Sequence, residues 1–149
     1  MSTEKISIWN ASPSIKEIEW MKKNTLSQSL GIEITEIGND FIKGTMPVDE
    51  RTKQPFGICH GGAYVALAEE LGSIASWLVV DGQNFIGVGV EINANHLKAV
   101  RSGIVTAICK PVHIKGRTHV WEIKITDDAG DLCCISRFTC AIVAKNKIM

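Results

Sequence analysis

The longest apolar stretch of this 149-residue chain covers residues 59–80, and its only charged side chains are Glu69 and Glu70. It opens on His60-Gly61-Gly62 and is long enough for about five turns of helix. A helix that is apolar on nearly every side lies at the centre of a fold, where the rest of the chain covers it. Buried carboxylates are costly unless they are paired or used. This segment is therefore the first place to look for chemistry.

The segments before this helix predict a short helix and a hairpin. Residues 14–24 have the composition of a short leading helix. Two strands are expected at residues 30–37 and 41–48, since a turn signal with glycine and asparagine separates them. The polar loop 49–57 then delivers the chain to the apolar helix.

The segments after the helix predict four antiparallel strands. The first has period two, with apolar side chains at Ile86, Val88, Val90, Ile92 and Ala94, which predicts one buried face. His96 has the same parity, so it should point toward the helix if the strand continues. The other three strands are expected at residues 104–114, 120–126 and 132–144.

This order of elements predicts an α+β fold in which an antiparallel sheet covers a central helix. The chain length favours a single domain, assigned here to residues 30–149, after an N-terminal extension over residues 1–29 that carries the short helix. One helix cannot cover both faces of the sheet or close its edges. We therefore expect self-association, at least into a dimer.

Composition excludes several classes of partner. Lys plus Arg (16) balance Asp plus Glu (16) without a basic stripe, so neither nucleic acid nor an anionic membrane is expected. The polar N-terminus has no signal-peptide pattern, and the two glutamates argue against a membrane span. The five cysteines form no CxxC pair, which favours buried, reduced thiols and no metal site. A cytoplasmic protein is expected.

Four stretches of the sequence together resemble the hotdog-fold acyl-CoA thioesterases. They are Thr45-Met46-Pro47-Val48-Asp49, Thr52-Lys53-Gln54-Pro55-Phe56-Gly57, His60-Gly61-Gly62 followed by Leu67-Ala68-Glu69, and Glu91-Ile92-Asn93-Ala94-Asn95-His96. The resemblance runs from about residue 31 to residue 143. Within the family it is similar to the branch with the 1,4-dihydroxy-2-naphthoyl-CoA thioesterase of menaquinone synthesis and the proofreading thioesterase of enterobactin synthesis. It implies a homodimer, with dimers pairing into a tetramer, and no metal or redox cofactor.

The resemblance also implies catalytic roles. Glu69 would attack the thioester or activate water, and Gly61, at the helix start, would donate its backbone N–H to the oxyanion. His60 could orient the loop or donate a second hydrogen bond, and Gln54 could hold the carbonyl or position the water. Ser73 completes this set. In the resembling enzymes the helix-start donor and the glutamate come from different subunits.

Coenzyme A needs an apolar channel for its pantetheine arm and cations for its phosphates. The residues expected to contact the substrate or CoA are Gly89, His96, Leu97, Lys98, Ala99, His113, Lys115, Gly116, Arg117 and Thr118. The resembling enzymes often have serine in place of Gly116 and arginine in place of Lys98. Glu70 is expected to be paired in the core or at an interface.

The sequence thus predicts an acyl-CoA thioesterase that releases CoA and a free aryl or medium-chain acid. Three alternatives stay open: hydrolysis of acyl or aryl groups on a carrier protein, a non-catalytic acyl-CoA-binding protein and a hotdog dehydratase. The acyl group is not defined, although Phe56, Tyr64, Leu71, Ile74 and Trp77 could shape its pocket.

Overall fold

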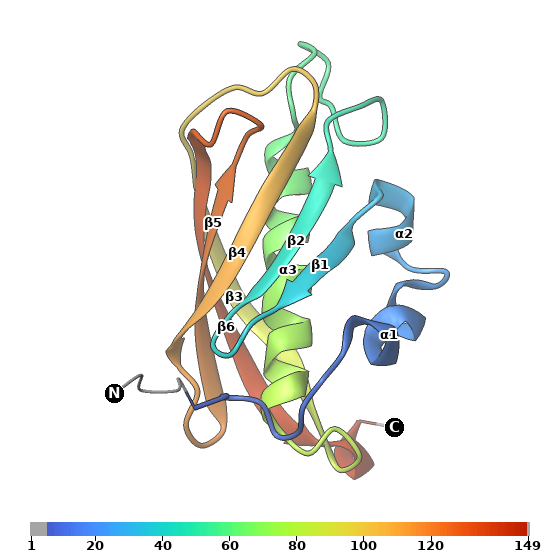
Figure 1. Cartoon of the computed structure of the whole chain (residues 1–149), viewed down its shortest axis with the longest axis vertical. Coiled ribbons are helices and arrows are strands. Elements are labelled where there is room, and N and C mark those ends of the chain that lie inside the picture. The colour runs from blue at the N-terminus through green and yellow to red at the C-terminus, as the bar shows by residue number, and fades with distance from the viewer. Residues whose placement is uncertain (1–5, 149) are drawn as a thin grey trace.

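One long helix lies against a six-stranded antiparallel sheet (Figure 1) in the computed structural model, which describes residues 6–148. The helix is α3 (Gly61–Val79), and the strands are β1 (Glu33–Ile37), β2 (Ile42–Pro47), β3 (Phe85–His96), β4 (Ile104–His113), β5 (Thr118–Thr126) and β6 (Leu132–Ala144). Their order across the sheet is β1-β2-β4-β5-β6-β3. The predicted antiparallel sheet with one long helix is confirmed, and it leaves β1 and β3 as the two edges.

The core is the interface between α3 and the sheet. Leu67 and Leu71 of α3 are fully buried, as are Trp121 and Ile123 of β5. Each side chain of this size contributes roughly 1.5–3 kcal/mol when it leaves water. The indole of Trp121 also donates a 2.8 Å hydrogen bond to Ser76 Oγ, which satisfies a buried polar group of the helix. The helix is therefore held on its sheet-facing side by both packing and polar contact.

The N-terminal region contains more helix than predicted. The leading helix is divided into α1 (Ile15–Ile18) and the 3-10 helix η1 (Glu19–Lys22), and a further helix, α2, covers Leu26–Leu30. The expectation of a strand from residue 30 was wrong by three residues at its start. Gly31 takes a left-handed conformation (φ 71°) that ends α2, and β1 begins only at Glu33.

A tryptophan pair fastens the N-terminal segment to the core. The ring of Trp9 stacks on that of Trp121 with centroids 6.4 Å apart and an angle of 15° between the planes. Trp9 Nε1 also donates a 2.6 Å hydrogen bond to the carbonyl oxygen of Gly38, in the β1–β2 turn. The segment before α1 is thus anchored both to the sheet core and to the first hairpin.

Strand β3 changes the face it presents halfway along its length. A bulge separates Gly89 from Glu91 in its pairing with β6. Before the bulge, Gly87 and Gly89 face α3, while Val88 and Val90 are 38% and 65% exposed. After it, the alternation is as predicted, and Ile92, Ala94 and His96 lie on the helix side. The prediction of one continuous apolar face was therefore wrong for residues 86–90.

Candidate active site

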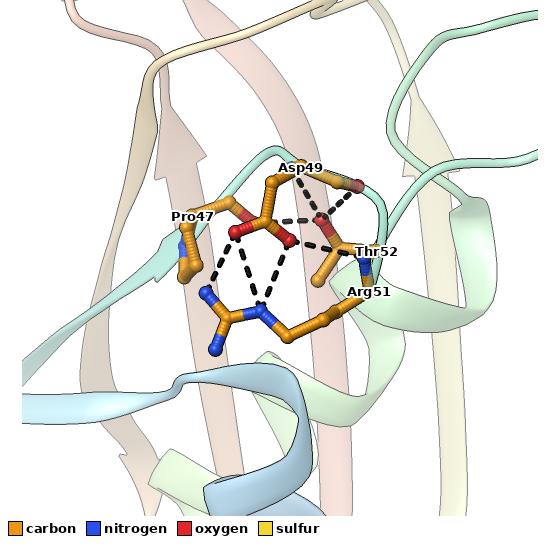
Figure 2. Close-up of polar contacts among 4 residues, drawn as sticks. All are labelled: Pro47, Asp49, Arg51 and Thr52. Atoms are coloured by element: carbon orange, nitrogen blue, oxygen red, sulfur yellow. Dashed lines mark hydrogen bonds and ion pairs between the residues drawn. The ribbon is translucent and has the colours of Figure 1, made fainter.

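The loop that leads into α3 is braced by a network of short polar contacts (Figure 2). Thr52 is buried, and its hydroxyl donates a 2.7 Å hydrogen bond to the carbonyl oxygen of Pro47 and accepts one of 3.2 Å from the Asp49 N–H. Arg51 Nη2 lies 2.6 Å from Asp49 Oδ2, and this contact holds the pKa of Asp49 below its usual value. No role was predicted for Asp49, Arg51 or Thr52, although Thr52 is the first residue of a stretch that resembles the thioesterase family, residues 52–57.

His60 is the N-cap of α3. Its backbone is extended (φ −70°, ψ 134°), and its Nδ1 accepts a 2.8 Å hydrogen bond from the Gly62 N–H. The His60 N–H donates a 2.8 Å bond to the Thr52 carbonyl, so the braced loop fixes the helix start. These bonds hold His60 at the junction of the loop and the helix, and both roles considered for it in catalysis stay predictions.

Gly61 is the first residue of α3, and within residues 6–148 its N–H has no hydrogen-bond acceptor. His96 approaches it closely, since a Cβ added at Gly61 would lie 2.8 Å from His96 Nε2. The imidazole stacks on the Tyr64 ring with centroids 5.7 Å apart. This unpaired N–H lies at the positive end of the helix dipole, where it can donate a hydrogen bond to an oxyanion.

A cavity of about 290 Å³ opens at this helix start, lined by Gln54, Ile58, Cys59, Gly61, Tyr64, His96, Leu97, Lys98 and Ala99. The structure therefore brings together six residues of the predicted site: Gln54, Gly61, His96, Leu97, Lys98 and Ala99. The Gln54 side-chain oxygen accepts a hydrogen bond from the Phe56 N–H, which leaves its NH₂ group as the end able to donate to a ligand.

Glu69 lies elsewhere, midway along α3 and against β3. A Cβ added at Gly89 would be 2.6 Å from Glu69 Oε1, so the glycine provides the space that the carboxylate occupies. Glu69 is eight residues after Gly61, which places it about 12 Å further along the helix. Reacting groups must come within about 3–3.5 Å of each other. The Glu69 and Gly61 of one chain therefore cannot act on the same carbonyl. Ser73, one turn beyond Glu69, is partly buried.

Apart from Gly89, which lies against Glu69, the predicted CoA-contacting residues are divided between the two ends of the molecule. His113 to Thr118 form the turn between β4 and β5, at the opposite end from the start of α3 (Figure 1). Gly116 and Arg117 line a hollow of about 490 Å³ beside Val80 and Asp81, which follow the end of α3. Within a single chain, this turn and the cavity at the start of α3 do not form one continuous site.

Lys98 is engaged within its own chain. Its ammonium lies 2.5 Å from Asp127 Oδ2 and 2.6 Å from Asp131 Oδ2, in the turn between β5 and β6. These two carboxylates raise the pKa of Lys98 and lower that of Asp127. A CoA phosphate would have to compete with them for this cation.

Comparison with known proteins shows the family to which this chain belongs. The model of the thioesterase superfamily matches residues 56–134. The chain belongs to the thioesterase superfamily. It is 46% identical over 136 residues to the 1,4-dihydroxy-2-naphthoyl-CoA hydrolase of Escherichia coli, covering 91% of this chain and 99% of the relative. It is 45% identical over 137 residues to the proofreading thioesterase EntH of Cronobacter turicensis, covering 91% and 98%. The crystal structure of a mutant thioesterase from Pseudomonas aeruginosa has a TM-score of 0.90 at 44% identity and covers 93% of this chain and 99% of that one.

These relatives make the chain a thioester hydrolase with the hotdog fold, as the sequence indicated. All five cysteines of the thioesterase are free and buried. Across residues 6–148, no three His, Cys, Asp or Glu side chains gather where they could hold a metal ion. Within the same residues, no helix has the length and apolar character needed to cross a membrane.

Glu70 of the thioesterase has a hydroxyl partner rather than a cation in the described part of the chain. No ion pair joins it to a cation within the described part of the chain. It points away from β3, toward Ser27 of α2, and burial raises the pKa of its carboxyl while the Ser27 hydroxyl offsets part of the effect. Pairing within the chain is thus limited to the Ser27 hydroxyl, and pairing of Glu70 at an interface stays a prediction.

Proposed function

We propose that this thioesterase hydrolyses aryl or medium-chain acyl-CoA esters to the free acid and CoA, at a site shared by two protomers. Glu69 of one protomer and the Gly61 N–H of its partner act on the same carbonyl. One observation carries the proposal: both groups lie against β3, which is a free edge of the sheet. The Glu69 carboxylate lies next to Gly89 of this strand, and Gly61 lies next to His96 of the same strand.

Pairing of β3 with a second copy of itself would bring the two groups together. In an antiparallel pair with a two-fold axis at Asn93, residue 93 lies opposite its own copy. The extra residue of the bulge before Glu91 then shifts the register by one, so Gly89 of one strand lies opposite His96 of the other, and both face the helix side. Glu69 would then face the partner's helix start. The pair would also cover Val88 and Val90, whose exposure on an edge strand otherwise invites aggregation. Pairing of two such dimers into a tetramer stays a prediction.

The same pairing supports a role for the β4–β5 turn in binding CoA. Thr118 pairs with Ala141, and Ala141 pairs with Val88 near the start of β3. The turn with Lys115 and Arg117 is thus at the end of β3 that would meet the partner's helix start. The cations of this turn would lie at the mouth of the shared site and bind the CoA phosphates there. Lys98 is less available for this role, because it forms ion pairs with Asp127 and Asp131.

The chemistry follows from the groups that meet there. Either Glu69 attacks the carbonyl carbon to form an anhydride that water opens, or it takes a proton from the water that attacks. In both cases negative charge develops on the carbonyl oxygen, the Gly61 N–H stabilises it, and the C–S bond breaks to release CoA thiolate. The substrate named for the E. coli relative is an aromatic acyl-CoA, which supports testing aryl esters first.

The test is release of free thiol from a panel of aromatic and aliphatic acyl-CoAs. Glu69→Gln should lose about a hundredfold or more in rate. The matched control is Glu36→Gln, the same change at an exposed residue of β1 that pairs with Lys43, and it should stay near the wild type. If the wild type binds the esters but releases no thiol, the enzyme proposal fails in favour of a binding protein. Faster release from an acylated carrier protein than from every CoA ester would move the substrate to the carrier.

A further inference from the structure

A second cavity lies on the other side of α3, beneath the N-terminal helices. Its volume is about 260 Å³, and its walls come from α1, η1, α2, β1 and α3. The apolar lining consists of Ile15, Ile18, Met21, Ile32, Ile34 and Ile74. None of the residues that line this cavity lines the cavity at the start of α3. It is therefore a separate compartment from the proposed catalytic site.

The polar lining of this cavity is mainly acidic. It consists of Ser27, Glu19, Lys22, Glu33 and Glu70. The ammonium of Lys22, its one cation, forms an ion pair with Glu33. Glu70 is the most deeply placed of the charged residues, since it comes from the central helix, and no cation among residues 6–148 pairs with it. The cavity thus combines apolar walls with a carboxyl group that lacks a counter-ion.

We propose that this cavity is a binding site for a small apolar amine, which enters as its ammonium ion and pairs with Glu70. The isoleucine and methionine side chains provide the surface for a hydrocarbon or aromatic body. A charge-assisted hydrogen bond to the ammonium would compensate for burial of the Glu70 carboxylate. An anionic ligand is disfavoured, because three carboxylates and one paired ammonium line the same space.

Two matched probes separate charge recognition from apolar filling. 2-Phenylethylammonium and 2-phenylethanol have nearly the same size and shape, but only the first is a cation. Binding to the full-length protein is followed by calorimetry and by NMR of isoleucine methyl groups, with Ile18, Ile34 and Ile74 reporting on the cavity. Ile142, which lines the hollow at the β4–β5 turn, serves as the distant control.

We expect the ammonium ion to bind at least about tenfold more tightly than the alcohol, because one charge-assisted hydrogen bond is at stake. Glu70→Gln should weaken binding of the ammonium ion by about tenfold or more and change binding of the alcohol by less than about threefold. The control Glu36→Gln, outside this cavity, should change neither.

Equal affinity for the two probes, or equal loss of both in Glu70→Gln, would overturn the proposal, since the cavity would then select for shape alone. Absence of shifts at the three cavity methyls would overturn it as well. Thiol release is measured in parallel on the wild type. The amine site and the thioesterase activity can therefore fail independently.

Discussion

Replacing Gly61 by proline would test the oxyanion donor directly, because it removes one N–H while preserving the helix. Gly61 is the first helical residue, where proline is tolerated, and its N–H has no acceptor among the described residues. His60, which would precede the proline, is already extended at ψ 134°. The substitution therefore costs no internal hydrogen bond and requires no new backbone conformation.

Gly61→Ala is the matched control for this change. It keeps the N–H but adds a Cβ at 2.8 Å from His96 Nε2, so the imidazole must move in both variants. The difference between alanine and proline then removes the displacement of His96 from the comparison and reports on the Gly61 N–H together with the space in front of it, which the proline ring fills. Loss of one oxyanion donor is worth roughly 3–4 kcal/mol, or about a hundredfold to a thousandfold in rate.

The assay is kcat for thiol release from a CoA ester that the wild type hydrolyses, with urea unfolding to compare the stability of the two variants. We expect kcat of Gly61→Pro to be about a hundredfold below that of Gly61→Ala at similar stability. If the two variants agree within about threefold while both remain folded, the Gly61 N–H does not stabilise the transition state and the reasoning is refuted.

Three further predictions follow from the same contacts. Refolding Glu69→Gln and Gly61→Pro chains together should restore about a quarter of wild-type activity, because half of the dimers are mixed and each holds one intact site; no recovery would place both groups in one chain. Because burial raises the pKa of Glu70 above 4.5, its stability contribution is full below that pH and is lost as pH rises through the folded-state value. Glu70→Gln should therefore stabilise the protein in urea unfolding near pH 7 but not near pH 4; the same gain at both would contradict this. Tyr64→Phe removes a buried hydroxyl whose one interaction within residues 6–148 is a weak one with the Cys59 thiol, so the free energy of unfolding should stay unchanged or rise by up to about 1 kcal/mol, and a clear loss would show that the interaction is strong.

The elements with strong periodicity could be predicted from the sequence, and the exceptions have local causes. The apolar run at residues 59–80 became α3, and the polar turns between the later strands were correctly located. Alternation failed at residues 86–90 because the bulge before Glu91 reverses the face of β3, and the pattern of side chains alone does not reveal a bulge. The helix α2 was missed because it is only five residues long.

The candidate site was only partly predictable. The resemblance assigned catalytic roles at the helix start and CoA contacts to His96 and the residues after it, and in the structure these two groups of residues line the same cavity. The resemblance implied that Glu69 and the helix start come from different subunits, but no pattern in the sequence indicated that the β4–β5 turn lies far from that cavity within a single chain. Their separation depends on the path of β3 and on the free edge that it forms, which are properties of the folded sheet.

The stacked pair of Trp9 and Trp121 gives the protein a built-in optical reporter. Two nearly parallel indoles at 6.4 Å couple their electronic transitions, so they should produce a circular-dichroism couplet that neither ring would show alone. One ring belongs to the segment before α1, and the other to the innermost surface of the sheet. Detachment of the N-terminal segment could therefore be followed without a label, separately from unfolding of the core.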